Sequence, residues 1–425
     1  MEFKASADRL NHNVFRYPAK FHFPIARKLV ELFTKAGDTV LDPFCGSGTL
    51  LVEAAALGRN SVGIDVDPLA ILVARAKTSL TDSEAMARAA TKFDKWLEEC
   101  RKLDEVTWGS FEKDIDEAAL EKTRTEIDAY IPNLPKLDHW FRRRAVQQLA
   151  VIRRQIVETT TGDAQQLLLL CFASIIRNSS NAGPVPVSGL EVTSHMLEKE
   201  RLGRTIDPWR LMRRALAKSL KATVDFNSAR RDGATCTVYE ADARLIDAEI
   251  VGKVAAVVTS PPYLVAVDYY RRHTLEMYWL GLTERRDDRL DLMTRYIGRD
   301  RIGLRNMPEE NAGAKATAER WLPRFPGIKP ARERAFRHYC DGMTRALARM
   351  TEIVTPGGPI VIVAGDVRFC GVPVSMLELM HDLAGNKLTI ADHLWYPIAN
   401  RYMLYKRNNE ANIAADRILV FRGRV

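Results

Sequence analysis

The sequence predicts an α/β fold in which helices cover a mostly parallel sheet of seven strands. Three observations support this: seven short apolar runs bounded by Gly, Asp or Pro, helical patterning between most of them, and a length of 425 residues. Runs that are apolar throughout are typical of strands buried on both faces of a sheet. The predicted strands are residues 38–44, 60–67, 235–242, 254–260, 358–366, 388–396 and 415–421.

Two helical segments interrupt this pattern. Residues 81–232 carry apolar side chains at three- and four-residue spacing, as in AQQLLLLCFASIIRN. A loop of this length without structure of its own would be improbable. We therefore expect a main domain formed by residues 1–80 and 233–425, an inserted helical domain at 81–232, and a second helical excursion at 264–350.

Composition limits the possible partners. The 63 Lys and Arg residues against 54 Asp and Glu leave a net charge of +9, which makes nucleic acid a plausible partner without requiring one. The six cysteines lie far apart without CxxC pairs, so we expect reduced thiols and no metal. The N-terminus lacks an apolar signal core, and no run approaches the roughly 20 apolar residues that span a bilayer. These features predict a cytoplasmic protein without a membrane partner.

A glycine loop follows the first strand. The stretch DPFCGSGT at residues 42–49 leads into a helix, where glycines allow close backbone approach and the first N–H groups are unpaired. Leu51 stands where a dinucleotide fingerprint needs a third glycine, so a ligand without a pyrophosphate is favoured. Asp65 ends the second strand, where a carboxylate can accept hydrogen bonds from both hydroxyls of a ribose. A nucleoside-like cofactor is predicted, with Cys45 as a small turn residue rather than a nucleophile.

The fourth strand ends in VVTSPPY, residues 257–263. Two prolines make a rigid loop that offers carbonyl oxygens and lacks N–H donors. Such a loop suits the exocyclic amino group of a base, because acceptors that draw its hydrogens out of the ring plane restore the nucleophilicity of the nitrogen. We expect Ser260 Oγ and the Pro261 carbonyl to be these acceptors and Tyr263 to stack on the base. The alternative is a turn that only ends an edge strand.

Together these stretches resemble a known family. DPFCGSGT and TSPPY are similar to the cofactor and catalytic motifs of S-adenosylmethionine-dependent DNA amino-methyltransferases, and TSPPY is the form typical of the N4-cytosine branch. YPAKFHFPIARKLV, residues 17–30, is similar to the family's N-terminal cofactor segment. The resemblance implies the Rossmann-like class I methyltransferase fold, S-adenosyl-L-methionine as cofactor, and direct methyl transfer with no covalent intermediate and no metal.

The resemblance also implies site residues. The catalytic residues would be Ser260, Pro261, Pro262 and Tyr263. Asp242 would face the adenine amino group, and Lys20 and Phe21 would close over the cofactor. The full set of implied cofactor-binding residues is Tyr17, Lys20, Phe21, Asp42, Pro43, Phe44, Cys45, Gly46, Ser47, Gly48, Thr49, Asp65, Val66, Asp242 and Ala243.

Two basic stretches are candidate DNA contacts. Residues 199–231 hold ten Lys and Arg against three acids, so Arg213 and Arg214 are predicted to contact phosphates, although a solvated helix face explains the same pattern. Directly after the Pro-Pro loop, further side chains are placed to contact a flipped base or its flanking phosphates. These are Tyr269, Tyr270, Arg271 and Arg272.

The leading interpretation is a site-specific DNA cytosine-N4 methyltransferase of a restriction-modification or related defence system, acting on double-stranded DNA and with a possible cognate restriction endonuclease. Adenine-N6 methylation is the nearest alternative, because the two amines are chemically similar. An RNA amino-methyltransferase and a non-catalytic DNA-binding subunit are the others. The insertion lies between Asp65 and Asp242, so the sequence leaves open which helical segment reads the target, as it does the recognition sequence and the oligomeric state.

Overall fold

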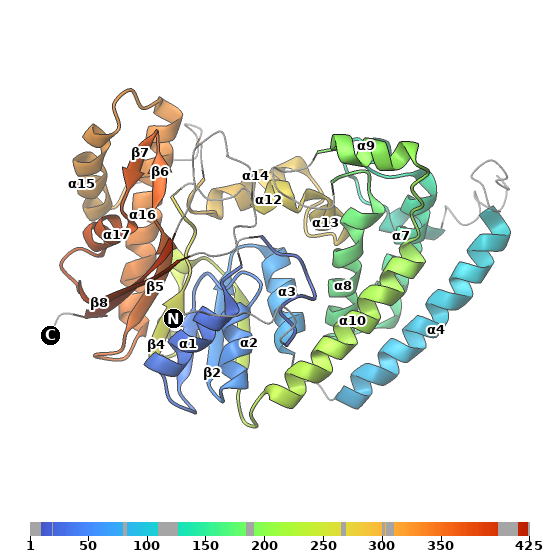
Figure 1. The fold of residues 1–425 in the computed structure, drawn as a ribbon, viewed down its shortest axis with the longest axis horizontal. Coiled ribbons are helices and arrows are strands. Elements are labelled where there is room, and N and C mark those ends of the chain that lie inside the picture. Colours follow the sequence, from blue (N-terminus) through green and yellow to red (C-terminus); the bar gives the residue numbers. More distant parts are fainter. Residues whose placement is uncertain are drawn as a thin grey trace.

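The computed structural model describes residues 10–18, 20–79, 83–108, 126–183, 191–264, 269–299, 302, 310–397 and 415–423. Its main sheet has seven strands in the order β3-β2-β1-β4-β5-β9-β8 (Figure 1). The strands are β1 (Thr39–Asp42), β2 (Asn60–Asp65), β3 (Cys236–Glu240), β4 (Ala256–Thr259), β5 (Ile360–Gly365), β8 (Leu388–Pro397) and β9 (Ala415–Gly423). All seven predicted strands are confirmed.

The sheet is mostly parallel, as predicted. Strands β1 to β5 pair in parallel, whereas β9 runs antiparallel to both β5 and β8. A small second sheet of β6 (Val367–Phe369) and β7 (Val372–Val374) was not predicted, because three-residue strands are too short to show a pattern.

Helices cover both faces of the sheet. Val258 of β4 packs with α1 (Phe23–Phe33) and α2 (Thr49–Ala56), and the neighbouring Val257 packs with α16 (Pro330–Ile353) and α17 (Met376–Ala384) on the other face. Adjacent strand residues point to opposite faces, so both must be apolar. The result is a three-layer α/β arrangement with buried strands.

Local capping signals set several helix starts. Gly48 adopts a left-handed conformation (φ 71°) directly before α2. Asp67 caps α3 (Pro68–Thr78), where its Oδ1 accepts a hydrogen bond from the Leu69 N–H at 2.9 Å. Asp207 caps α10 (Pro208–Ala229) in the same way. Each of these starts combines a capping residue or a glycine with the apolar pattern that follows it.

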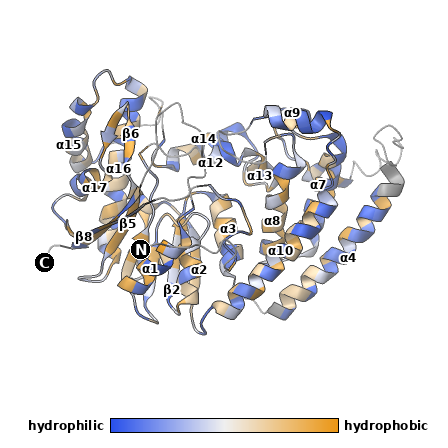
Figure 2. Cartoon of the chain, in the orientation of Figure 1, coloured by the Kyte–Doolittle hydropathy of each residue, from blue (hydrophilic) through white to orange (hydrophobic). Residues whose placement is uncertain are grey.

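Helices dominate the described part of the predicted insertion. They are α4 (Ser83–Trp108), α6 (Leu137–Trp140), α7 (Arg143–Thr159), α8 (Gly162–Ile176), α9 (Ser194–Arg201) and α10. Hydrophilic and hydrophobic residues alternate along α4 and α10, as expected of amphipathic helices (Figure 2). The core of these helices also includes Trp279 of α13 (Thr274–Trp279), whose ring lies edge-on to Phe141 and Phe172.

The insertion also packs against the helix layer of the sheet. Leu170 and Ala173 of α8 share a buried cluster with Leu69 and Val73 of α3. The second excursion contributes α12 (Tyr269–Arg272), α13, α14 (Arg286–Arg295), α15 (Ala312–Trp321) and α16, and α12 and α14 lie between the insertion and the C-terminal helices in Figure 1. Within the described residues, no helix is long and apolar enough to cross a membrane.

Candidate active site

A cavity lies at the carboxyl ends of β1, β2, β3 and β4. From β1 the sheet is extended first to one side by β2 and β3 and then to the other side by β4 and β5. Open α/β sheets bind ligands at such a point, where the strand order reverses. All of the predicted cofactor-binding residues except Gly48 line the cavity, together with Ser260 and Pro262. Three residues of the second excursion that the sequence did not predict also line it, and these are Arg295, Tyr296 and Ile297.

Gly48 has a packing role that explains its absence from the lining. A Cβ atom at this position would lie 3.0 Å from the Cβ of Ala74 on α3, and the backbone has a positive φ. Glycine is therefore required for the close approach of α2 and α3. Gly46, which also has a positive φ, does line the cavity.

Asp65 ties the end of β2 to the glycine loop. Its Oδ2 accepts a hydrogen bond from the Gly46 N–H, and its Oδ1 accepts one from the Asp67 N–H, both at 2.9 Å. Burial, followed by the neighbouring Asp67 charge, raises the pKa of Asp65 to about 7. Because a carboxylate has about four acceptor positions, further donors can still bind. The side chain fits the predicted contact with ribose hydroxyls.

A buried hydrogen bond joins the two sequence motifs. The Thr259 hydroxyl donates to Oδ1 of Asp42 at 2.7 Å, and the Phe44 N–H donates to the same oxygen at 3.2 Å. Burial raises the pKa of Asp42 to about 7. Thr259 directly precedes Ser260, so this bond positions the start of the proline loop beside the glycine loop.

The two remaining residues of the proline loop, Pro261 and Tyr263, are not among the residues that line the cavity. Pro261 is buried, and Tyr263 is half-buried with its hydroxyl donating to Oδ1 of Asp416 at 3.0 Å. Oδ2 of the same carboxylate accepts from Tyr396 at 2.7 Å. Burial, the Asp416 charge and this hydrogen bond raise the pKa of Tyr263 well above its usual range. The sequence did not indicate Asp416, which lies at the start of β9.

The segment before α1 is attached to α2 by a hydrogen bond to the buried carboxylate of Glu53. Glu53, fully buried in α2, accepts hydrogen bonds from His12 Nε2 at 2.7 Å and Arg27 Nη1 at 3.1 Å. Burial lowers the pKa of His12 to about 4, so the ring donates as a neutral imidazole. Lys20 Nζ donates to the His12 carbonyl at 2.5 Å. Glu53 thereby holds the segment that carries Tyr17, Lys20 and Phe21.

A buried lysine of α3 forms a hydrogen bond with the backbone of the glycine loop. Lys77 Nζ donates a hydrogen bond to the Ser47 carbonyl at 2.7 Å, and burial lowers the pKa of Lys77 well below its usual range. Ser47 Oγ is buried without a hydrogen-bond partner among the described residues. This hydroxyl, in the lining of the cavity, is therefore available to a polar ligand. No sequence signal marks Lys77, which lies in an ordinary helical pattern.

Two predicted DNA contacts have other surroundings in this structure. Tyr270 is only 1% exposed, and the Arg289 guanidinium lies 5.1 Å from its ring centre, so it is a core residue rather than a surface contact. Arg213 is bound by Asp94 at 2.8 Å and by Glu98, so its charge is already compensated. Only the backbone of Tyr269 lies among the described residues.

The other three predicted DNA contacts remain accessible. Arg214 and Arg271 are exposed, and Arg272 is half-buried. No group of three or more potential metal ligands occurs among the described residues.

Comparison with known proteins finds similarity to DNA methyltransferases. Residues 3–75 match the sequence profile of a family described as DNA methylase. The type II methyltransferase M.MvaI of Kocuria varians is 26% identical over 175 residues, which are 40% of this chain and 35% of the relative. The type II methyltransferase M.BsoBI of Geobacillus stearothermophilus is 23% identical over 302 residues, which are 67% and 56% of the two chains. The chain thus spans about a third to just over half of the length of these curated relatives.

A solved rRNA methyltransferase, aviRa from Streptomyces viridochromogenes, aligns over 99% of this chain and 94% of its own, with 12% identity and a TM-score of 0.36.

Proposed function

We propose that this relative of the DNA amino-methyltransferases transfers a methyl group from S-adenosylmethionine to an exocyclic amine of a DNA base. One observation carries the proposal: the Thr259–Asp42 hydrogen bond, 2.7 Å long, brings the proline loop and the glycine loop to one cavity. A cofactor loop and an amine-accepting loop in the same cavity provide the proximity that group transfer requires.

The residues present fit this cofactor. Asp65 keeps acceptor capacity for ribose hydroxyls, and the orphaned Ser47 Oγ offers a partner for a polar group. Tyr17, Lys20 and Phe21 cover the cavity from the N-terminal side. When bound, S-adenosylmethionine supplies an electrophilic methyl group on a sulfonium centre.

The chain's own groups prepare the amine for attack. Ser260 Oγ and the Pro261 carbonyl would accept hydrogen bonds from the two amine N–H groups as the nitrogen becomes pyramidal. The new N–C bond would form as the C–S bond of the sulfonium breaks, and the nitrogen would then release one proton to solvent. These acceptors act mainly in the transition state, where the nitrogen develops positive charge. The loop's prolines hold the acceptors rigidly and provide no competing N–H donor. Pro262 lines the cavity together with Ser260.

The finer proposal is that the base is a flipped cytosine methylated at N4, because TSPPY is the form typical of that branch. Adenine N6 remains the second candidate, since the same acceptors suit either amine. The substrate would be double-stranded DNA, and the biological setting would be restriction-modification or a related defence system with a cognate endonuclease. Relatives named type II methyltransferases support this setting.

The test is methyl transfer by the purified chain with methyl-labelled cofactor. Unmethylated plasmid DNA, total RNA and a Ser260→Ala variant on plasmid DNA form the three arms. We expect label in DNA only, which nucleoside chromatography then assigns to N4-methylcytosine or N6-methyladenine. Sequencing of methylated DNA from expressing cells gives the site. Label in RNA alone would contradict the proposal, as would wild-type incorporation no higher than that of Ser260→Ala.

A further inference from the structure

Arg244 occupies the carboxylate that was expected to bind the adenine of the cofactor. Oδ1 of Asp242 accepts hydrogen bonds from the backbone N–H and from Nε of Arg244, both at 2.9 Å. Oδ2 accepts from Nε at 3.0 Å and from Nη2 at 2.5 Å. Three N–H groups of Arg244 make these four contacts, because the Nε–H is shared between the two oxygens, and they use most of the about four acceptor positions that a carboxylate offers. An adenine amino group would therefore have to compete with the Arg244 guanidinium for this carboxylate.

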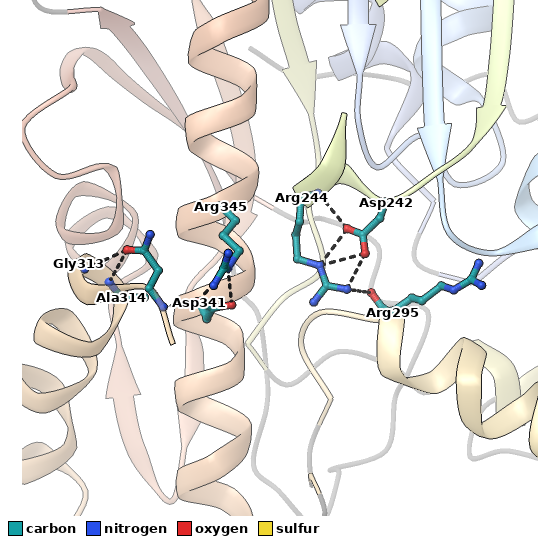
Figure 3. Close-up of polar contacts among 8 residues, drawn as sticks. Asp242, Arg244, Arg295, Gly313, Ala314, Asp341 and Arg345 are labelled. Carbon is teal, nitrogen blue, oxygen red and sulfur yellow. Dashed lines mark hydrogen bonds and ion pairs between the residues drawn. The ribbon is translucent and has the colours of Figure 1, made fainter. Parts of the chain in front are cut away.

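The same guanidinium also contacts a second segment of the cavity wall, residues 295–297. Arg244 Nη2 also donates to the carbonyl oxygen of Arg295 at 3.3 Å, at the end of α14 (Figure 3). Arg295, Tyr296 and Ile297 line the same cavity as Asp242 and Ala243. Figure 3 shows the Arg295 side chain directed away from Arg244, so only its backbone is held.

The far side of this wall is fixed by close packing. Ile297 is 4% exposed and lies against Gly342 of α16, where a Cβ atom would come within 2.8 Å of Ile297 Cγ1. The wall is thus clamped between α16 and the Arg244 hydrogen bond. Arg244 and Asp242 are themselves only 14% and 13% exposed, so solvent competes weakly for their contacts.

We propose that Asp242 anchors Arg244 instead of reading the adenine amino group, and that Arg244 is a positioning residue that holds residues 295–297 against the cofactor. The inference rests on the proposed cofactor. It assigns adenine binding to the shape of the wall rather than to a hydrogen bond with the amine.

Calorimetric binding of two ligands tests this. One is S-adenosylhomocysteine, and the other is its analogue with hydrogen in place of the 6-amino group. We expect the wild-type chain to bind both within about threefold, because no acceptor depends on the amine. Arg244→Gln should weaken both equally, by about tenfold or more. Asp242→Asn should cause a similar loss, and the double variant should be no worse than either single variant, because the two side chains act as one unit.

Arg345→Gln is the matched control. Arg345 forms an equivalent pair with Asp341 on α16, at 2.9 Å, outside the cavity lining (Figure 3). Its substitution should leave both affinities unchanged. Arg244→Lys keeps the charge but not the forked geometry, so it should restore only part of the affinity.

Two results would overturn the inference. In the first, the wild-type chain binds the amine-free analogue at least about tenfold more weakly than S-adenosylhomocysteine, and Asp242→Asn abolishes that difference. In the second, Arg244→Gln binds S-adenosylhomocysteine with the wild-type affinity. Trypsin cleavage after Arg295 in the ligand-free protein provides a second readout. It should accelerate in Arg244→Gln and not in Arg345→Gln, and equal rates would also refute the positioning role. A wild-type chain that binds neither ligand would refute the proposed function, while this cleavage still tests the contact.

Discussion

The hydroxyl of Tyr263 donates a hydrogen bond to Oδ1 of Asp416 at 3.0 Å, which attaches the proline loop to β9, the last strand along the chain. Asp416 also accepts from Tyr396, so one carboxylate joins the proline loop, β8 and β9. A stacking role for the Tyr263 ring would leave this hydroxyl dispensable. The observed bond gives it a function in holding the loop.

We therefore expect Tyr263→Phe to lower the single-turnover rate of methyl transfer by about tenfold, because a hydrogen bond to a charged acceptor is lost. Cofactor affinity should not change. Tyr396→Phe is the control, since it removes the other bond to Asp416 without releasing the loop, and its rate should stay close to wild type. A wild-type rate in Tyr263→Phe would contradict the role of the bond.

Ser260→Ala should lower the methyl-transfer rate by about a hundredfold while changing cofactor affinity less than about twofold. The reason is that an acceptor for the amine hydrogens contributes mainly when the nitrogen is pyramidal. Single-turnover kinetics and equilibrium dialysis separate the two quantities. Equal losses in rate and affinity would instead make Ser260 a cofactor-binding residue.

Cofactor affinity should rise with pH. The pKa of Asp65 is raised to about 7, chiefly by burial, and only the charged carboxylate accepts from both ribose hydroxyls. Below pH 7 the carboxyl is protonated before binding, so each unit of acidification should weaken binding by up to about tenfold. Above pH 8 or so the affinity should level off.

Calorimetry across this pH range checks the prediction, and Asp65→Asn should flatten the profile. Asp42 has a similar pKa of about 7 and is engaged by Thr259, so Asp42→Asn should keep the pH dependence if Asp65 is responsible. An unchanged profile in Asp65→Asn would assign the titration to another group.

Glu53→Ala should lower the free energy of unfolding by about 3 kcal/mol, because it removes the buried partner of His12 and Arg27. It should also weaken cofactor binding, since the N-terminal segment loses its anchor. Glu31→Ala is the control: Glu31 pairs with Arg27 at the surface, at 3.4 Å, and should cost less than about 1 kcal/mol. Urea denaturation distinguishes the two, and similar losses in both would contradict an anchoring role.

The salt dependence of DNA binding should separate two adjacent arginines. Arg214 is exposed, so Arg214→Gln should reduce the slope of log affinity against log salt by up to about 0.9 if it contacts a phosphate. Arg213→Gln should leave the slope unchanged, because Asp94 and Glu98 already hold its guanidinium. Equal effects would mean that these ion pairs open on DNA.

Local patterns predicted much of this molecule. The seven strands are short apolar runs with clear boundaries. The glycine and proline loops directly follow parallel strands, so both loops lie at the carboxyl ends of those strands and meet there. The contacts that the sequence did not reveal join distant positions. Asp416 lies 153 residues beyond Tyr263, and nothing local marks it as the partner.

Position along the chain also did not reveal the surroundings of two candidate DNA contacts. Arg213 belongs to a basic stretch, but its acidic partner Asp94 lies 119 residues away on another helix. Tyr270 follows the proline loop in sequence, yet the turn of α12 directs it into the core. A one-dimensional pattern gives the residue type, whereas exposure depends on which helix packs against it.

The cluster shared by α8 and α3 has a geometric consequence for recognition. An insertion held by a common core cannot swing as a domain on a linker does. If the insertion reads DNA, this packing fixes the distance between the recognised base pairs and the modified base. The duplex must then change its conformation to place the base in the cavity. A change of target spacing would require repacking of the α8–α3 contact rather than a longer linker.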